Sequence, residues 1–201
     1  MNITQFLDSK GFSLEKQTIK EGYCQEIPQQ VEDLCSLIKR PGLNVMEIGF
    51  NGGHSAEIFL KSNKDLILTS FDLGAHSHVI PAKEFIDMNY PKRHTLIIGD
   101  SMKTIPSFIN ANKNTKFDII FIDGGHDYEV AKEDIMNCFH LAHKDTIVLM
   151  DDTMFTEKWE KVYNIGPTKA WVESLQENKI TEINRKDYYL GRGMAWGKYN
   201  I

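Results

Sequence analysis

The sequence predicts a doubly wound α/β fold, in which helices cover both faces of a mostly parallel sheet. Short runs rich in β-branched residues alternate with helical stretches along the chain. Each run is nearly continuous in apolar residues, as expected of parallel strands that are buried on both faces. The last two runs are joined by a short loop, which favours an antiparallel hairpin. We therefore expect a seven-stranded sheet with five parallel strands and a C-terminal antiparallel hairpin.

The first 43 residues are expected to form a helical segment that precedes the sheet. Apolar side chains recur at helical spacing in its second half, at Val31, Leu34, Cys35 and Ile38. A proline and a glycine at positions 41 and 42 provide a stop signal. This pattern predicts a helix from about Pro28 onward, with the core of the protein at 44–201.

The strands and the last helix follow in order. The five runs expected to pair in parallel are 44–48, 66–71, 94–98, 117–122 and 146–150. A helix is predicted over 167–177, with Pro167 in its first turn and Trp171 and Leu175 on an apolar face. The two strands of the hairpin are predicted at 179–185 and 194–199. They would end the sheet with a reversed edge.

Length and composition limit the function classes. The chain has 201 residues, of which 41% are hydrophobic, so a single domain spanning 1–201 is expected. A net charge of -5 argues against a dedicated nucleic-acid surface. No apolar run approaches the roughly 18 residues that a membrane span needs, and no signal pattern opens the chain. Three cysteines without CxxC spacing fit a reducing compartment, which predicts a cytoplasmic protein.

A turn rich in glycine follows the first predicted strand. Open parallel sheets bind ligands at the carboxyl ends of their strands, and this strand ends in Glu47, after which come Gly49, Gly52 and Gly53. A helix from about His54 would direct free amides and a positive dipole end at the turn, which suits a carboxylate or a phosphate. The spacing E-x-G-x-x-G-G differs from the dinucleotide fingerprint G-x-G-x-x-G, so a dinucleotide is disfavoured.

The next two strand ends carry further polar residues. Asp72 lies about two dozen residues after the turn, where an acid can accept both hydrogen bonds of a ribose diol. Asp100 and Ser101 follow the third strand and would reach the base of the same nucleoside. Each of these residues has an alternative role as the cap of a turn or helix.

Three carboxylates converge at the ends of the fourth and fifth strands. Asp123 ends one strand, and Asp151 and Asp152 end the next. Like charges in one cleft repel each other unless a cation neutralises them. Oxygen ligands favour Mg²⁺, with Mn²⁺ or Ca²⁺ as alternatives. The other interpretation is that one aspartate caps a turn and the others face solvent.

At these positions the chain resembles the class I S-adenosylmethionine-dependent methyltransferases, which have a Rossmann-like fold, over about residues 44–199. Residues 46–56 resemble the first motif of the catechol O-methyltransferase branch. The resemblance implies that the methionine end of the cofactor is held by Glu47, Gly49, Asn51, Gly53 and Ser55. It further implies that Asp72 binds the ribose, and that Asp100 and Ser101 bind the adenine.

A second motif narrows the resemblance to the metal-dependent O-methyltransferases. Residues 122–128 are similar to the D-G-x-H-x-Y pattern of the macrocin O-methyltransferase and cephalosporin-hydroxylase-like groups. With Asp151 and Asp152, this motif matches the metal ligands of the family, and Asp123 also lies on the cofactor side. His126 stands where the catechol branch has its lysine base. We therefore expect Asp123 and His126 to be the catalytic residues.

The resulting hypothesis is an S-adenosylmethionine-dependent O-methyltransferase that uses Mg²⁺ to activate a hydroxyl of a small acceptor. Bound to the hydroxyl, the ion would lower its pKa and fix its direction, and His126 would take the proton near neutral pH. The Asp151-Asp152 pair resembles the sugar-modifying branch, which favours a sugar, a sugar nucleotide or another vicinal diol as acceptor. A homodimer is also considered, and neither a membrane nor a nucleic acid is expected as partner.

Three alternatives stay open. The protein could be a metal-independent methyltransferase with structural aspartates, an NAD-dependent oxidoreductase that uses the glycine turn for pyrophosphate, or a binding module without turnover. Acceptor pockets in such folds are built by N-terminal helices and by loops, which here are the 154–166 segment with Trp159 and Tyr163 and the 188–193 loop with Arg192.

Overall fold

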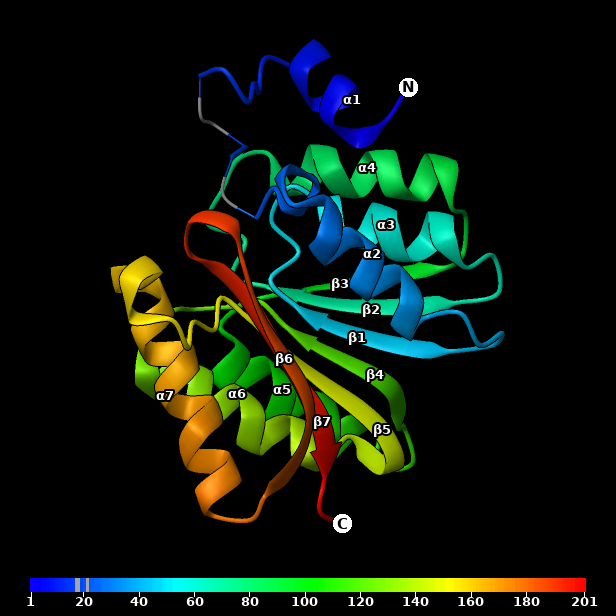
Figure 1. Cartoon of the computed structure of the whole chain (residues 1–201). Coiled ribbons are helices and arrows are strands. Elements are labelled where there is room, and N and C mark those ends of the chain that lie inside the picture. Colours follow the sequence, from blue (N-terminus) through cyan, green and yellow to red (C-terminus); the bar gives the residue numbers. More distant parts are fainter. Residues whose placement is uncertain (17–18, 21) are drawn as a thin grey trace.

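The computed structural model describes residues 1–16, 19–20 and 22–201, with only the backbone of Leu190. Seven strands form one sheet in the order β3-β2-β1-β4-β5-β7-β6 (Figure 1). The first five strands pair in parallel, and β7 pairs antiparallel with both β5 and β6. The predicted fold class is therefore confirmed.

The strand boundaries agree closely with the predicted ranges in the first half of the sheet. Strand β5 begins four residues earlier than predicted, where Ala142 pairs with Phe117 of β4, and the hairpin strands extend until Tyr188 pairs with Arg192. The strands are β1 (Asn44–Ile48), β2 (Ile67–Asp72), β3 (His94–Ile98), β4 (Phe117–Ile122), β5 (Ala142–Asp151), β6 (Ile180–Tyr188) and β7 (Arg192–Tyr199). Only a short 3-10 turn, Tyr189–Gly191, separates the strands of the hairpin.

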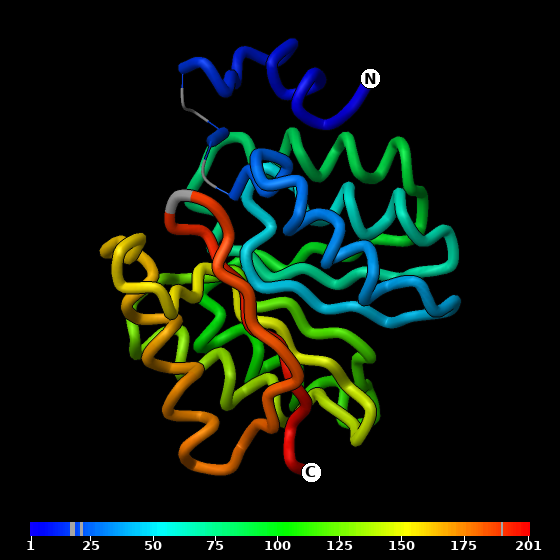
Figure 2. The backbone as a smooth tube through the Cα atoms, viewed as in Figure 1, coloured from blue at the N-terminus to red at the C-terminus, as the bar shows by residue number. Residues whose placement is uncertain are grey.

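The helices divide between the two faces of the sheet. On one face lie α2 (Pro28–Leu37), α3 (His54–Ser62) and α4 (Val79–Asn89), with α1 (Ile3–Ser9) packed on α3 and α4. On the other face lie α5 (Ser101–Ala111), α6 (Tyr128–Phe139) and α7 (Val162–Gln176). The backbone trace shows that the segment before α2 and the adjoining ends of β6 and β7 lie near each other, beside the carboxyl ends of the parallel strands (Figure 2).

The core consists of two apolar layers, one on each face. Val45 packs into the layer under α3, while its neighbour Met46 packs into the layer under α6. Successive side chains of a strand point to opposite faces, so a continuous apolar run fills both layers. The apolar runs that predicted the strands thus account for both halves of the core.

Two helices differ from the prediction. Helix α7 begins at Val162, five residues before the expected start, and Pro167 lies inside it. Helix α1 lies within the expected helical segment but before Pro28, where no individual helix was predicted, although Asn2 and Gln5 form a capping box that is visible in the sequence. Helix α2 begins at Pro28 as predicted. Residues 17–18 and 21 of the expected N-terminal helical segment lie outside the described residues.

The strand order reverses between β1 and β4, which are neighbours in the sheet. Ligands of open α/β sheets bind outside the carboxyl ends of the strands at such a point. Within the described part of the chain, no helix is both long and apolar enough to cross a membrane.

Candidate active site

Gly49 follows β1 directly and lies against the end of β4. Its φ is +95°, and a Cβ at this position would lie 1.8 Å from the carbonyl oxygen of Asp123. The amide of Gly49 donates to Phe71, and the amide of Asp123 donates to Ile48, so the ends of three strands are joined here. Only glycine allows this close approach of the backbone.

Glu47 and Ser55 hold the turn from within. The buried Glu47 carboxyl accepts hydrogen bonds from the Ser55 hydroxyl at 2.8 Å and from the Ser70 hydroxyl at 2.6 Å. Burial raises the pKa of Glu47 to about 7, although both hydroxyls oppose the shift. Neither Glu47 nor Ser55 lines the cavities described below. Both were predicted to contact the cofactor, but their visible contacts join β1, β2 and α3.

Gly53 also lies away from the cavities. It precedes α3 with a φ of +70°, and a Cβ there would meet the Ile3 side chain at 2.7 Å. Gly53 therefore allows α1 to pack on the turn. Asn51 is different, because it lines both cavities.

Asp72 holds two turns at once. One carboxylate oxygen accepts from the Asn51 amide and the other from the Gly74 amide, both at 2.7 Å. These bonds fix the carboxylate between the turns that follow β1 and β2. Asp100 accepts from the Met102 amide at 3.0 Å and so caps α5, while Ser101 opens that helix.

A cavity of about 460 Å³ extends along the ends of β1 to β4. Asp72, Asp100, Ser101 and Asp123, all predicted from the sequence to contact the cofactor, line it together. Its other lining residues are mostly apolar or glycine, including Phe71, Leu73, Met102 and Val130, together with the polar Asn51 and His76. An elongated ligand with a polar diol and a flat apolar part suits such a cavity.

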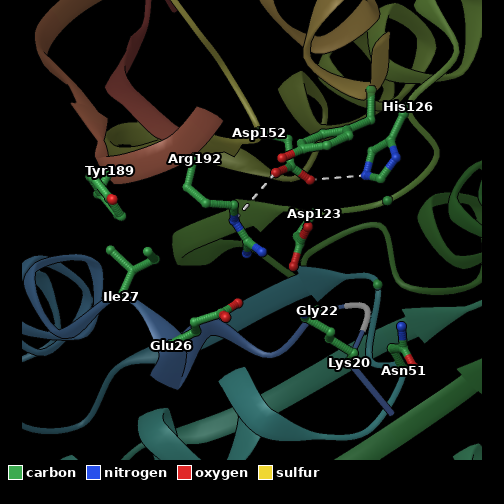
Figure 3. A pocket seen from close by; sticks show the side chains of 13 residues that line it. Lys20, Gly22, Glu26, Ile27, Asn51, Asp123, His126, Asp152, Tyr189 and Arg192 are labelled. Carbon is green, nitrogen blue, oxygen red and sulfur yellow. Dashed lines mark ion pairs between the residues drawn. The ribbon is translucent and has the colours of Figure 1, made fainter. Parts of the chain in front are cut away.

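A second cavity, of about 790 Å³, lies beside the first. Both are lined by Gly49, Asn51, Asp123 and Gly124, so the two spaces meet where β1 and β4 end. The larger cavity is also lined by distant parts of the chain (Figure 3), namely Lys20, Gly22, Glu26, Ile27, His126, Asp152, Tyr163, Tyr189 and Arg192.

Asp123, His126 and Asp152 come together in the larger cavity. Their ligand atoms all lie within 4.8 Å of one another, and His126 Nε2 lies 2.9 Å from Asp152 Oδ2. Burial, followed by the charges of Asp151 and Asp152, raises the pKa of Asp123 well above its usual range. The three residues could hold a cation, and one oxygen of the buried Asp152 lacks a hydrogen bond within the described chain.

Asp151 is placed differently from the prediction. Its carboxylate is buried and accepts hydrogen bonds from Gln30 Nε2 at 2.7 and 2.8 Å. Among the described residues, it is not in the group that could hold a metal, and His126 takes the expected third position. Gln30 engages both oxygens of Asp151, whereas Asp152 follows the strand with a left-handed φ of +54° and contacts His126.

Sequence reasoning missed the contacts that Gln30 and Arg192 make with the carboxylates. Gln30 is fully buried and lies one helical turn before Leu34. A glutamine on the apolar face of a predicted helix could have indicated a buried polar partner. Arg192 stood in a loop expected near the acceptor, but nothing local indicates that its side chain joins the carboxylates. Burial alone would lower the pKa of Arg192, but Asp151, Asp152 and Asp123 outweigh burial and raise it.

Residues 46–153 match the family model described as a methyltransferase domain, which covers more than half of the 201 residues. The chain belongs to this methyltransferase family, and it is an S-adenosylmethionine-dependent methyltransferase. No curated protein matches the sequence.

Solved structures share the fold at low sequence identity. The O-methyltransferase TomG from Streptomyces achromogenes, which is involved in tomaymycin synthesis and was solved with S-adenosylmethionine, superposes with a TM-score of 0.70 at 16% identity, covering 92% of this chain and 88% of TomG. An O-methyltransferase from Bacillus cereus in complex with S-adenosylhomocysteine gives 0.68 at 18% identity, with coverages of 85% and 81%. CalS11, a TDP-rhamnose 3'-O-methyltransferase of calicheamicin biosynthesis, gives 0.65 at 18% identity, with coverages of 86% and 79%.

Proposed function

We propose that the protein transfers the methyl group of S-adenosylmethionine to a hydroxyl oxygen of a small acceptor. The observation that carries this proposal is the junction of the two cavities at Asp123. A cofactor in the smaller cavity and an acceptor in the larger one would meet there. In-line transfer depends above all on such alignment of donor and acceptor.

The cofactor assignment rests on the smaller cavity. Asp72 would accept hydrogen bonds from the ribose, and Asp100 with Ser101 would contact the adenine. Gly49 and Asn51 border both cavities, so the methionine end would lie at their turn. Glu47, Gly53 and Ser55 would act indirectly by holding this turn in place.

The larger cavity fits a divalent cation. Asp123, Asp152 and His126 would hold it; the two carboxylates suit Mg²⁺ or Mn²⁺, whereas the imidazole is a ligand that transition metals such as Zn²⁺ and Fe²⁺ favour. Arg192 offsets one of the three carboxylate charges at Asp123, Asp151 and Asp152, and a divalent ion would offset the other two. When bound, the ion would lower the pKa of the acceptor hydroxyl and hold it in place.

A metal-independent methyltransferase is the second candidate, favoured by the contact between His126 and Asp152. At 2.9 Å, the carboxylate can orient the imidazole ring and stabilise its protonated form. His126 would then take the hydroxyl proton itself. One residue cannot serve as a metal ligand and as this base through the same nitrogen, so the two candidates exclude each other.

The acceptor stays a prediction. CalS11 acts on a sugar nucleotide, and a sugar, sugar nucleotide or other vicinal diol is the class that we propose for this chain. A homodimer and a cytoplasmic location also stay predictions.

The test is a methyl-transfer assay with labelled cofactor and a panel of sugars, catechols, polyols, amines and thiols. Loss of transfer in EDTA, reversed by Mg²⁺ or Mn²⁺ while S-adenosylhomocysteine still binds, would support the metal-dependent candidate. Full activity in EDTA would assign the reaction to the His126–Asp152 pair. Transfer to amines or thiols but to no hydroxyl would overturn the proposal.

A further inference from the structure

Arg192 is the least expected residue of the larger cavity. Its side chain is only 18% exposed, although arginine is rarely buried without a partner. Among the residues that the structure describes, none accepts a hydrogen bond from its buried Nε. The ion pair with Asp152 Oδ1 spans 3.7 Å, which is longer than a hydrogen bond.

Arg192 is poorly explained as a structural partner of the carboxylates. A guanidinium that binds a carboxylate for stability makes short bonds, often two in parallel. Asp152 instead places its other oxygen on His126, and Asp151 accepts from Gln30. The positive charge of Arg192 lies near these groups, while the N–H groups of its guanidinium are available to bind a ligand in the cavity.

The walls around Arg192 indicate what that could be. Figure 3 shows the guanidinium directed into the cavity, with the Glu26 carboxylate on the facing wall and the Tyr189 and Ile27 side chains to one side. In the described part of the chain, no ion pair joins Glu26 to Arg192. The space between them therefore has hydrogen-bond donors on one wall and an acceptor on the other.

We propose that Arg192 binds a carboxylate of the acceptor, so that the substrate class is a hydroxycarboxylic acid. The planar fork of an arginine matches a carboxylate in two parallel bonds. A further hydroxyl of the same molecule would donate to Glu26. This inference rests on the proposed function, and it names the acceptor class for the same cavity.

The experiment compares acids with their uncharged amides. The probes are glucuronate with glucuronamide and 3,4-dihydroxybenzoate with 3,4-dihydroxybenzamide, tested for methyl transfer and for binding to the protein loaded with S-adenosylhomocysteine. The wild-type protein should prefer at least one acid over its amide by about tenfold or more, the usual size of a hydrogen bond to a charged group. Arg192→Gln should reduce kcat/KM for that acid about tenfold more than for its amide.

Arg185→Gln is the matched control, because Arg185 lies on β6 of the same hairpin and stacks on Phe155 outside the cavity. It should leave both rates and their ratio unchanged. Since the ratio of acid to amide does not depend on the folded fraction, a loss of stability in Arg192→Gln does not obscure the result. Thermal unfolding of each variant provides the check.

The possible outcomes separate the two proposals. The inference is overturned if wild type treats acids and amides alike, if Arg192→Gln lowers both equally, or if no acid in the panel binds or reacts. Acids that bind through Arg192 while no hydroxyl in the panel is methylated would retain the inference and contradict the proposed function.

Discussion

The two cavities meet at Asp123, yet their walls come from different parts of the chain. The smaller cavity is lined by the turns that directly follow β1 to β4, and backbone amides fix its central acid, Asp72. The larger cavity combines the segment before α2, the end of β5, the start of α7 and the tip of the hairpin. Its polar contacts are made by charged side chains such as Asp152 and Arg192.

This difference indicates a division of roles. Changes to the smaller cavity should alter the backbone and cofactor binding, because its shape depends on turns and glycine conformations. Changes to the larger cavity should alter turnover while cofactor affinity stays the same. Substitutions on either side of Asp123 test this division.

The largest effect is expected from Gly49→Ala. The added Cβ would overlap the carbonyl of Asp123, and the residue would keep an unfavourable φ of +95°. We expect the free energy of unfolding to fall by about 3 kcal/mol or more and S-adenosylhomocysteine binding to be lost. Urea denaturation and calorimetry measure the two effects.

Gly42→Ala is the matched control. Gly42 has a φ of +68°, but a Cβ there would meet nothing within 4 Å. It should cost about 1 kcal/mol of strain and leave binding intact. If Gly49→Ala bound S-adenosylhomocysteine like wild type, the close approach of β1 and β4 would not define the cofactor site.

Asp152→Asn tests the larger cavity. The left-handed backbone of Asp152, with a φ of +54°, tolerates asparagine, so the fold should persist. Loss of the charge beside His126 should lower kcat by about 100-fold or more, since this pair positions the reacting hydroxyl or its base. The affinity for S-adenosylhomocysteine should change less than about twofold.

Asp145→Asn, on the exposed part of β5, is the control and should leave kcat unchanged. A parallel loss of kcat and cofactor affinity in Asp152→Asn would show that the two cavities do not act separately.

Glu47→Gln tests the support beneath the smaller cavity. The folded protein keeps a proton on Glu47 up to a pKa of about 7, whereas the unfolded chain releases it near 4.5. The stability that Glu47 contributes is therefore present at low pH and is lost as the pH rises between these values. The total is about 3 kcal/mol, from about 1.4 kcal/mol per pKa unit.

Glutamine carries no charge at any pH, so the variant should lose less stability than wild type between about pH 4 and about pH 8. Urea denaturation at both pH values measures the difference, with the exposed Glu84→Gln as control. Identical pH slopes for wild type and Glu47→Gln would contradict a protonated Glu47.

The difference between the two cavities also explains how much of the fold and of the site could be predicted from the sequence. The strands and their parallel pairing follow from apolar runs, and Asp72, Asp100, Ser101 and Asp123 line one cavity because parallel strands place their ends together. Local sequence patterns are therefore enough to predict most residues of the smaller cavity. The role of Glu47 could not be read in this way, since its partner Ser70 is contributed by β2.

The larger cavity depends on contacts across long stretches of chain. Gln30 and Asp151 are 121 residues apart, and their contact turns the Asp151 carboxylate away from the group with Asp123. Similarly, Arg192 reaches Asp152 only because β7 pairs antiparallel with β5. Spacing and periodicity contain no information about such pairs, so the choice between Asp151 and His126 required the structure.

The smallest effect is expected from Asp72→Asn, which keeps the shape of the side chain. Its two carboxylate oxygens accept from the amides of Asn51 and Gly74, whereas asparagine has a single acceptor oxygen, so only one of these two bonds can be kept. We expect S-adenosylhomocysteine to bind about tenfold more weakly, as for the loss of one hydrogen bond to a charged group. At saturating cofactor, kcat should be close to that of wild type, and the exposed Asp65→Asn should change neither value.

A ribose contact predicts more than weaker binding. Wild type should bind the 2'-deoxy analogue of S-adenosylhomocysteine more weakly than S-adenosylhomocysteine itself. Asp72→Asn should reduce that difference in affinity, because the 2'-hydroxyl and the Asp72 carboxylate contact each other in the proposed complex. An undiminished difference would make Asp72 a residue that only shapes the turns. Asp72 would then act as Glu47 and Ser55 do, by holding the backbone of the turns in place. The ribose would need another hydrogen-bond partner among the residues at the strand ends.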